Sequence, residues 1–316
     1  MVTGPTADFN AQSVEDALRA QLVAGDRMLA DALPALPHLL AADDPVLFGP
    51  DVLALVRGVL LDLAGQLLAA RAETAGDAEG EAMPAEGREG LARLLAAERC
   101  ILSHVHAIAI EARMIARIAE RSGLDPVLTP LAEDHAGSPG QVGSVSGRAV
   151  LAAQARFVQR IGRMEHPLAE LPGEQFHLAL LALRSFAGER DPAVLATDRK
   201  LRSVYDEGAG RLAIIARFLA ALALEPVFAL DARHAGLSVF LSALALSTGQ
   251  ARDSAILALG ECQLMRLALS LRAAGLDDRA MQSQFFLLHP YVGAPVGFDA
   301  LSPDRAAALL GTGGTS

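Results

Sequence analysis

Apolar residues recur in this chain at three- and four-residue steps, which is the spacing of one face of an α-helix. The clearest stretch runs from Leu91 to Ile115, where the charged side chains lie largely off the apolar stripe. The alternation typical of strands is nearly absent, and the abundant Ala and Leu favour helices. We therefore predict an all-α protein of about ten helices, either an irregular multi-helix bundle or a helical array.

Glycine, proline and acidic residues divide this helical pattern. The segment 76–87 mixes Gly and Pro with Asp and Glu, a composition typical of solvated loops and linkers. We predict a helical N-terminal segment over 1–75, this acidic loop or linker over 76–87, a main helical domain over 88–310 and a flexible tail over 311–316. Within the main domain, the pattern predicts long helices over 88–122, which ends at Gly123, and over 252–274.

Short sequence elements recur about 100 residues apart. Ile115-Ala116-Arg117 returns as Ile215-Ala216-Arg217, and Leu124-Asp125-Pro126-Val127 returns as Leu224-Glu225-Pro226-Val227. An acidic residue followed by proline is also a common helix start, and a chain rich in Ala and Leu produces chance matches. A weak internal duplication and independent helix starts are both compatible with this pattern.

The charge balance and the hydropathy pattern exclude several classes of protein. Lys and Arg number 27 against 37 Asp and Glu, a net charge of −10, which disfavours a dedicated nucleic-acid binder. The first residues lack the basic segment and the apolar run of a secretory signal. The most apolar windows, 212–230 and 235–251, are interrupted by charged residues, proline or hydroxyl side chains, as in buried core helices. We expect a cytoplasmic protein without a transmembrane segment.

The motifs of common enzyme classes are missing. The glycine-rich segment 140–147 has neither the dinucleotide-binding spacing nor the Lys of a P-loop. Its closest approach to a nucleophile elbow, 143–147, carries Val where the nucleophilic Ser belongs. We assign no catalytic residue and no cofactor. We expect a non-enzymatic helical adaptor, regulatory or assembly protein whose partner is a protein, either another chain or a second copy.

One spacing in the sequence is compatible with a metal site. Glu174 and His177 form a Glu-x-x-His pair on one face of a predicted helix, and His104 and Glu111 lie one heptad apart on another. Di-iron bundles use the Glu-x-x-His spacing twice, whereas this chain has it once. A helical-bundle metalloprotein or metal-dependent enzyme is therefore the first alternative, with these four residues as ligands. Histidines held by ordinary hydrogen bonds are the competing interpretation.

Arginines accumulate where acidic residues are absent, between Asp134 and Glu165. Arg156, Arg160 and Arg163 share one face of a predicted helix. Because guanidinium groups bind carboxylates and phosphates through two hydrogen bonds, these three are candidate partner-binding residues. A solvated face that pairs with acids elsewhere in the chain is the alternative.

The predicted helix over 212–224 is apolar on nearly all sides, which is typical of a buried helix. Such a helix could line an internal ligand site, so a carrier or sensor of an apolar small molecule is the second alternative. The aromatic segment 285–291 is expected to pack against the last helices, with a partner or ligand groove as the alternative.

Overall fold

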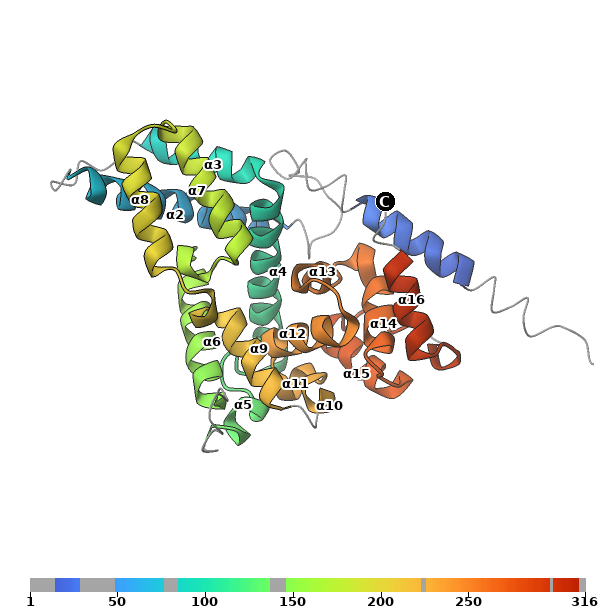
Figure 1. Cartoon of the computed structure of the whole chain (residues 1–316). Coiled ribbons are helices and arrows are strands. Elements are labelled where there is room, and N and C mark those ends of the chain that lie inside the picture. The colour runs from blue at the N-terminus through green and yellow to red at the C-terminus, as the bar shows by residue number, and fades with distance from the viewer. Residues whose placement is uncertain are drawn as a thin grey trace, which may run out of the picture. The chain divides into compact units, whose positions relative to one another are not determined.

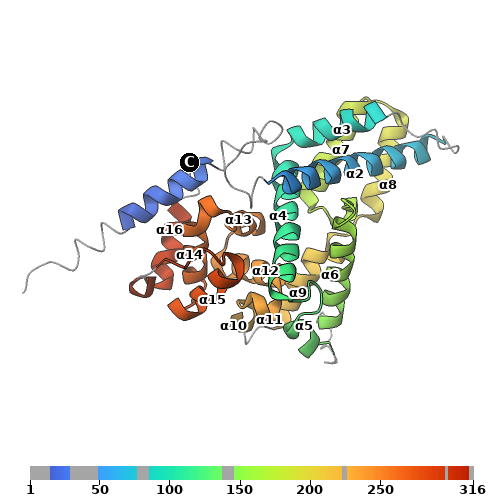
Figure 2. The same cartoon turned by 180° about the vertical axis from the view of Figure 1, so that it is seen from behind.

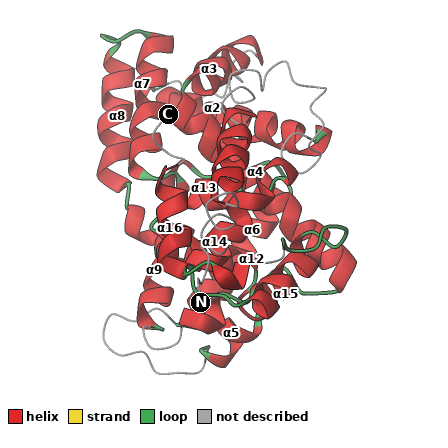
Figure 3. Ribbon diagram, turned by 90° about the vertical axis from the view of Figure 1, so that its right-hand side faces the viewer, coloured by secondary structure: helices red, strands yellow, loops and turns green. Residues whose placement is uncertain are grey.

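The computed structural model describes residues 15–28, 49–76, 85–136, 146–222, 226–295 and 298–312. These residues contain α-helices and short 3-10 helices and no strand (Figure 3), which confirms the predicted all-α class. A helix over 15–28 precedes fifteen α-helices, α2 to α16. This number exceeds the expected ten because several helices are short and two predicted long helices are broken.

The chain divides into two compact units. One comprises Pro50–Ser242, and the other joins Met1–Gly49 to Ala243–Ser316. The helices on either side of the acidic segment, α2 (Pro50–Ala75) and α3 (Ala85–Ala97), pack against each other within the first of these units. The predicted boundary at 76–87 stays a prediction. Residues 77–84 of that segment and 313–316 of the predicted tail lie outside the described residues.

Helix α2 organises one half of the Pro50–Ser242 unit. Its apolar face packs against α3, α4 (Arg99–Ser122) and α8 (Pro192–Val204), and α7 (Gly173–Ala187) packs against α3, α4 and α8. Figures 1 and 2 show α2 crossing one end of α4. The buried side chains of α2 follow the three- and four-residue spacing of its sequence, so packing and pattern agree.

The other half of this unit is built around α6 (Gly147–Ile161), which runs roughly parallel to α4 in Figures 1 and 2. Helix α6 packs against α5 (Pro130–Asp134) and α9 (Arg211–Ala221). The contact with α5 is close, because a Cβ on Gly147 would lie 1.9 Å from the carbonyl oxygen of Ala132. The short helices α10 (Pro226–Ala229) and α11 (Ala232–Ala235) and the start of α12 (Leu237–Thr248) complete the unit.

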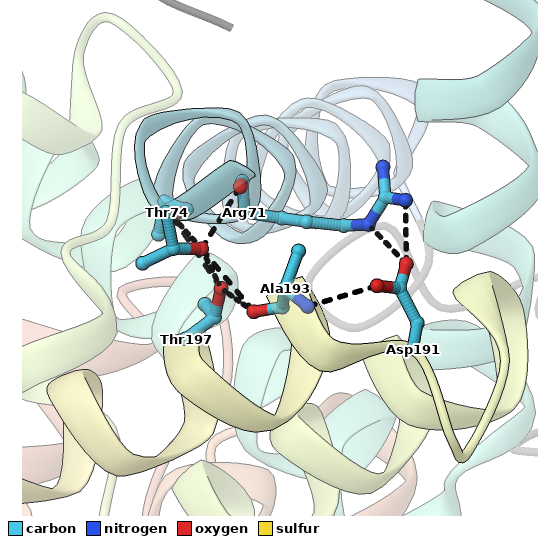
Figure 4. Close-up of polar contacts among 6 residues, drawn as sticks. Arg71, Thr74, Asp191, Ala193 and Thr197 are labelled. Atoms are coloured by element: carbon cyan, nitrogen blue, oxygen red, sulfur yellow. Dashed lines mark hydrogen bonds and ion pairs between the residues drawn. The ribbon is translucent and has the colours of Figure 1, made fainter. Parts of the chain in front are cut away.

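Polar contacts fasten α8 to α2 (Figure 4). Asp191 caps α8 by accepting a hydrogen bond from the amide of Ala193, and it pairs with Arg71 of α2 at 2.6 Å. The Arg71 guanidinium and the Ala193 amide both lower the pKa of the Asp191 carboxyl. The hydroxyls of Thr74 and Thr197 lie 2.5 Å apart. Each hydroxyl donates a hydrogen bond to the carbonyl oxygen of Ala193. The first turn of α8 is thus held against α2 by Arg71 and Thr74 of α2 and by Thr197 of α8 itself.

The described part of the second unit contains the helix over 15–28, the end of α12 and four C-terminal α-helices. These are α13 (Arg252–Leu257), α14 (Leu264–Ala273), α15 (Asp278–Leu288) and α16 (Pro303–Thr312). Arg266 of α14 binds Asp26 of the N-terminal helix at 2.5 Å, so residues 240 positions apart are joined within this unit. Across both units, the described residues also form short 3-10 helices at Leu168–Glu170, Glu207–Ala209, Glu261–Gln263 and Phe298–Ala300.

Two predicted long helices are each divided in the structure. The predicted helix over 88–122 forms α3 and α4, separated at Glu98, whose backbone is extended. The predicted helix over 252–274 forms α13 and α14, separated by residues around Gly260. The predicted end at Gly123 is confirmed, because this residue adopts φ 66° and its amide bonds the carbonyl oxygen of Ala119. Propensity alone gave no reason for the break at Glu98.

Among the described residues, α2 is the one helix long and apolar enough to cross a membrane by length and composition. Half of its most apolar window is buried inside the structure. A core helix of a water-soluble fold passes the same test. The buried side chains of α2 pack against α3, α4 and α8.

Candidate functional site

A groove of about 490 Å³ lies between α2, α4 and α6, all within the Pro50–Ser242 unit. Four alanines, three of them on successive turns of α4, leave space between the helices because their side chains are small. They are Ala54, Ala112, Ala116 and Ala119. Larger apolar side chains form the rest of the walls: Leu55 from α2, Ile115 from α4, and Phe157, Val158 and Ile161 from α6. We call this feature the α2–α4–α6 groove.

Met164 lies at the edge of the groove, just beyond the end of α6. It is the one non-glycine residue with a positive φ, 61°, in the described part of the chain. Its side chain lies on Gly58 of α2, since a Cβ at that glycine would fall 2.3 Å from Sδ of Met164. Backbone in this region is costly for a residue other than glycine, asparagine or aspartate. The close contact with a glycine explains how the methionine is held there while remaining 43% exposed.

The groove contains one ion pair, between Asp51 of α2 and Arg113 of α4. The Asp51 side chain is 63% exposed and that of Arg113 is 36% exposed. Arg113 donates from Nη2 to the carboxylate, whereas its buried Nε has no hydrogen-bond acceptor among the described residues. The charged part of the groove is therefore limited to this ion pair, and Arg113 is the less exposed of its two members.

A second ion pair lies in the core behind Phe157. Glu111 of α4 is fully buried and receives two hydrogen bonds from Arg211 of α9, at 2.9 and 3.0 Å. Ser238 of α12 donates to the same carboxylate at 2.6 Å. The Arg211 guanidinium also lies 3.7 Å from the ring centroid of Phe157. Gln154 of α6 completes this buried cluster, at 3.5 Å from Arg211.

Two buried histidines border this cluster. The rings of His104 and His166 meet edge to face, with centroids 6.3 Å apart. Burial, the His104 ring and the guanidinium of Arg211 together lower the pKa of His166 to about 3, so its imidazole is neutral at pH 7. Two residues of α2 position it: Asp62 accepts from its backbone amide at 2.8 Å, and Gln66 donates to its carbonyl oxygen at 2.9 Å. The turn that carries Met164 is thereby anchored to α2 as well.

The four metal candidates of the sequence lie in two different environments. His104 and Glu111 are buried, and Glu111 is bound to Arg211. Glu174 and His177 lie exposed on α7, where the ring of His177 contacts Arg202 of α8 at 2.7 Å. In the described ranges no three His, Cys, Asp or Glu side chains are grouped so that they could hold a metal ion. A metal site of these four residues stays a prediction that the geometry does not assemble.

The three arginines predicted to bind a partner lie on or just after α6. Arg156 and Arg163 are exposed and Arg160 is half-buried. None of them forms an ion pair within the part of the chain that the structure describes. They form an open cationic face rather than a face already neutralised by neighbouring acids.

Several residues of these sites carried no recognisable signal in the sequence. Arg211, Gln154 and Ser238 are separated from Glu111 by 43 to 127 positions in the chain, and only packing brings them together. The one available signal was the position of Arg211 at the start of a helix that is apolar apart from this residue and Arg217. The apolar helix that motivated a ligand site, 212–224, does not line the groove, which lies instead between α2, α4 and α6.

Comparison with known proteins adds no relative: no family model, no curated protein and no solved structure matches the chain. The function therefore has to be argued from the groove and the charged groups themselves.

Proposed function

We propose that this is a non-enzymatic binding protein that carries or senses an apolar small molecule, held in the α2–α4–α6 groove. The observation that carries the proposal is the groove itself, about 490 Å³ in volume with twelve uncharged residues among the fourteen that line it. Small-molecule sites in proteins span about 300–1,000 Å³ and combine apolar walls with a few polar groups. The volume of the groove lies within this range, and its walls are apolar apart from Asp51 and Arg113.

The walls of the groove also favour an apolar occupant energetically. A ligand that covers Ala116, Val158 and Met164, whose side chains are exposed or half-buried, removes apolar surface from water on both partners, at about 25 cal/mol for each Å². Met164 supports this role, because its unbranched, polarisable side chain adapts to ligands of different shape. The neighbouring contact with Gly58 limits how far it can move toward α2.

The proposal is tested with an uncharged fluorescent probe, N-phenyl-1-naphthylamine, and a variant that fills the groove. Ala116→Phe places a ring among the groove walls from an exposed position of α4, so the fold should tolerate it. Ala155→Phe makes the same change at an exposed position of α6 outside the groove, and is the matched control. We expect saturable binding to the natural protein and to Ala155→Phe, and at least a tenfold loss of affinity in Ala116→Phe.

Two results would oppose this function. Equal probe binding by both phenylalanine variants would place the probe elsewhere on the protein. A protein that binds no apolar probe, and from which organic solvent extracts no small molecule after purification under native conditions, would leave the groove without a ligand role.

A second candidate function is that of an adaptor or assembly protein, and the open arginine face of α6 favours it. Arg156, Arg160 and Arg163 have no acidic partner among the described residues, while the chain as a whole carries a net charge of −10. A second copy of the chain would supply the complementary acids. Salt-sensitive self-association in sedimentation velocity, abolished by Arg156→Ser with Arg163→Ser, is the expected result. A monomer at all protein and salt concentrations would exclude self-assembly.

A further inference from the structure

Two of the fourteen residues that line the α2–α4–α6 groove are charged, Asp51 and Arg113, and their contrast indicates the chemistry of the occupant. Arg113 is the more enclosed of the two and lies on the wall of α4, between Ala112 and Ile115 along the chain. Asp51 is largely exposed and lies in the first turn of α2. Water therefore competes less for Arg113 than for Asp51 when a ligand enters the groove.

Arg113 has N–H donors that its contact with Asp51 does not use. A guanidinium carries five N–H donors, and the contact with Asp51 uses the Nη2 atom. The buried Nε atom has no acceptor among the described residues, which leaves one donor unmatched in the present arrangement. A carboxylate binds such a fork through two parallel hydrogen bonds, which are stronger than bonds between neutral groups.

Asp51 can give up this contact at low cost. It lies at the N-terminal end of α2, where the helix dipole and the unpaired backbone amides stabilise a negative charge. Its exposed carboxylate also remains accessible to water. A competing anion on Arg113 would therefore not leave Asp51 buried and without a partner.

We infer that the ligand of the groove is an amphipathic monocarboxylate, with an apolar chain or ring against Ala116, Val158 and Met164 and its carboxylate on Arg113. This inference rests on the proposed function, because it names the class of molecule that the same groove would hold. Arg113 is then the residue that determines specificity for the charged end, and Asp51 occupies its place in the free protein.

The test compares three probes with the same ten-carbon chain and different ends: decanoate, decanol and decylammonium. Each displaces N-phenyl-1-naphthylamine from the natural protein at neutral pH and constant ionic strength. We expect decanoate to displace the dye at concentrations at least tenfold below those of decanol, and decylammonium to be the weakest. Isothermal titration of decanoate checks that displacement reflects direct binding with one site per chain.

Three variants assign the preference to its residue. Arg113→Met should abolish the advantage of decanoate and leave decanol unchanged, whereas Arg113→Lys should retain part of it. Asp51→Asn should strengthen decanoate binding, because it removes the competing anion from the guanidinium. Arg99→Met removes an exposed arginine of the same helix, α4, outside the groove and is the matched control, expected to behave as the natural protein. Circular dichroism confirms that each variant is folded.

The outcomes separate this inference from the proposed function. If Ala116→Phe blocks the dye but Arg113→Met binds decanoate as well as before, the groove holds a ligand and the assignment of a carboxylate is wrong. Preference for decanol or decylammonium would also overturn that assignment. If Ala116→Phe leaves decanoate binding intact, the groove is not the site and both statements fail. A dimer that Ala116→Phe dissociates and decanoate does not would make a second copy the occupant, which also overturns the inference.

Discussion

The buried ion pair between Glu111 and Arg211 offers a sharp test of how the core of the Pro50–Ser242 unit is held together. The perturbation is a cycle of Glu111→Leu, Arg211→Met and the double variant. Each single change leaves one buried charge without its partner, while the double change replaces both charges by apolar side chains of similar length. Arg211 cannot escape the penalty by losing its proton, because a guanidinium stays charged in proteins.

The size of the effect follows from the geometry of the pair. Both carboxylate oxygens of Glu111 accept from Arg211, at 2.9 and 3.0 Å, and both residues are at least 95% buried. Removing one member of such a pair costs about 3–5 kcal/mol, whereas apolar replacement of both is often neutral. We expect each single variant to lose about 3–5 kcal/mol and the double variant to lose under about 2 kcal/mol, part of it from the Ser238 hydroxyl that loses its acceptor.

Urea unfolding followed by circular dichroism at 222 nm measures these losses. The chain has no Trp, so the usual fluorescence signal is absent. Because the chain forms two compact units, it can unfold in more than one step, and hydrogen exchange of α4 and α9 identifies the step that contains the pair. Additive losses, with the double variant as unstable as the sum of the singles, would refute the view that the two charges compensate each other.

Three further changes test other contacts of the same unit. Thr197→Val removes a fully buried hydroxyl that bonds Thr74 at 2.5 Å, and urea unfolding should show a loss of about 1–2 kcal/mol, whereas no loss would mean that this contact does not hold α8. His166 is neutral in the folded protein down to a pKa of about 3 but titrates near 6.5 when unfolded, so its contribution to stability is complete above pH 6.5 and falls as the pH decreases toward 3. Relative to His166→Gln, the natural protein should therefore lose about 2 kcal/mol between pH 7.5 and pH 5, and parallel pH curves would contradict the burial of a neutral imidazole. Gly147→Ala should lower the free energy of unfolding by about 1–3 kcal/mol, because the new Cβ would lie 1.9 Å from the backbone of α5. Gly162→Ala is the control and should not destabilise, because its nearest contact is an ordinary one at 3.4 Å. Equal effects of the two changes would argue against the close approach of α5 and α6.

Much of the helical fold could be predicted because its signals are local. Glu174 and His177 lie on one helix, α7, as predicted, and α4 ends at the predicted glycine, Gly123. Proline, glycine and acidic residues next to apolar stripes determine such ends without help from distant parts of the chain. The weak internal duplication stays a prediction: Ile115-Ala116-Arg117 lies in a helix of 24 residues and Ile215-Ala216-Arg217 in one of 11, and residues 224 and 225 of the second element lie outside the described residues.

The break at Glu98 shows what local signals omit. The residues around it favour a continuous helix, yet the chain turns there so that α3 and α4 both pack against α2. Tertiary packing overrides propensity at such a point, because burying two apolar faces outweighs a few helical hydrogen bonds.

The candidate site was the least predictable part. Glu111 was identified from its spacing to His104, but as a metal ligand, and its observed partner Arg211 lies 100 positions away. In a chain so rich in arginine, the position of Arg211 at the start of a largely apolar helix is too weak a signal to identify it as a buried residue. The groove depends on the spacing between α2, α4 and α6, which come from distant parts of the chain. The sequence of a single helix does not predict how far it lies from the other two.

Occupancy of the α2–α4–α6 groove by an apolar molecule is reported most directly by the methyl resonance of Met164. The chain has seven methionines, so ¹³C-methyl labelling gives a small set of signals, and Met164→Leu assigns the one at the groove edge. Titration with decanoate should shift the Met164 signal saturably and leave those of Met265 and Met281, which belong to the other compact unit, unchanged. An unmoved Met164 signal at saturating decanoate would contradict a ligand role for the groove.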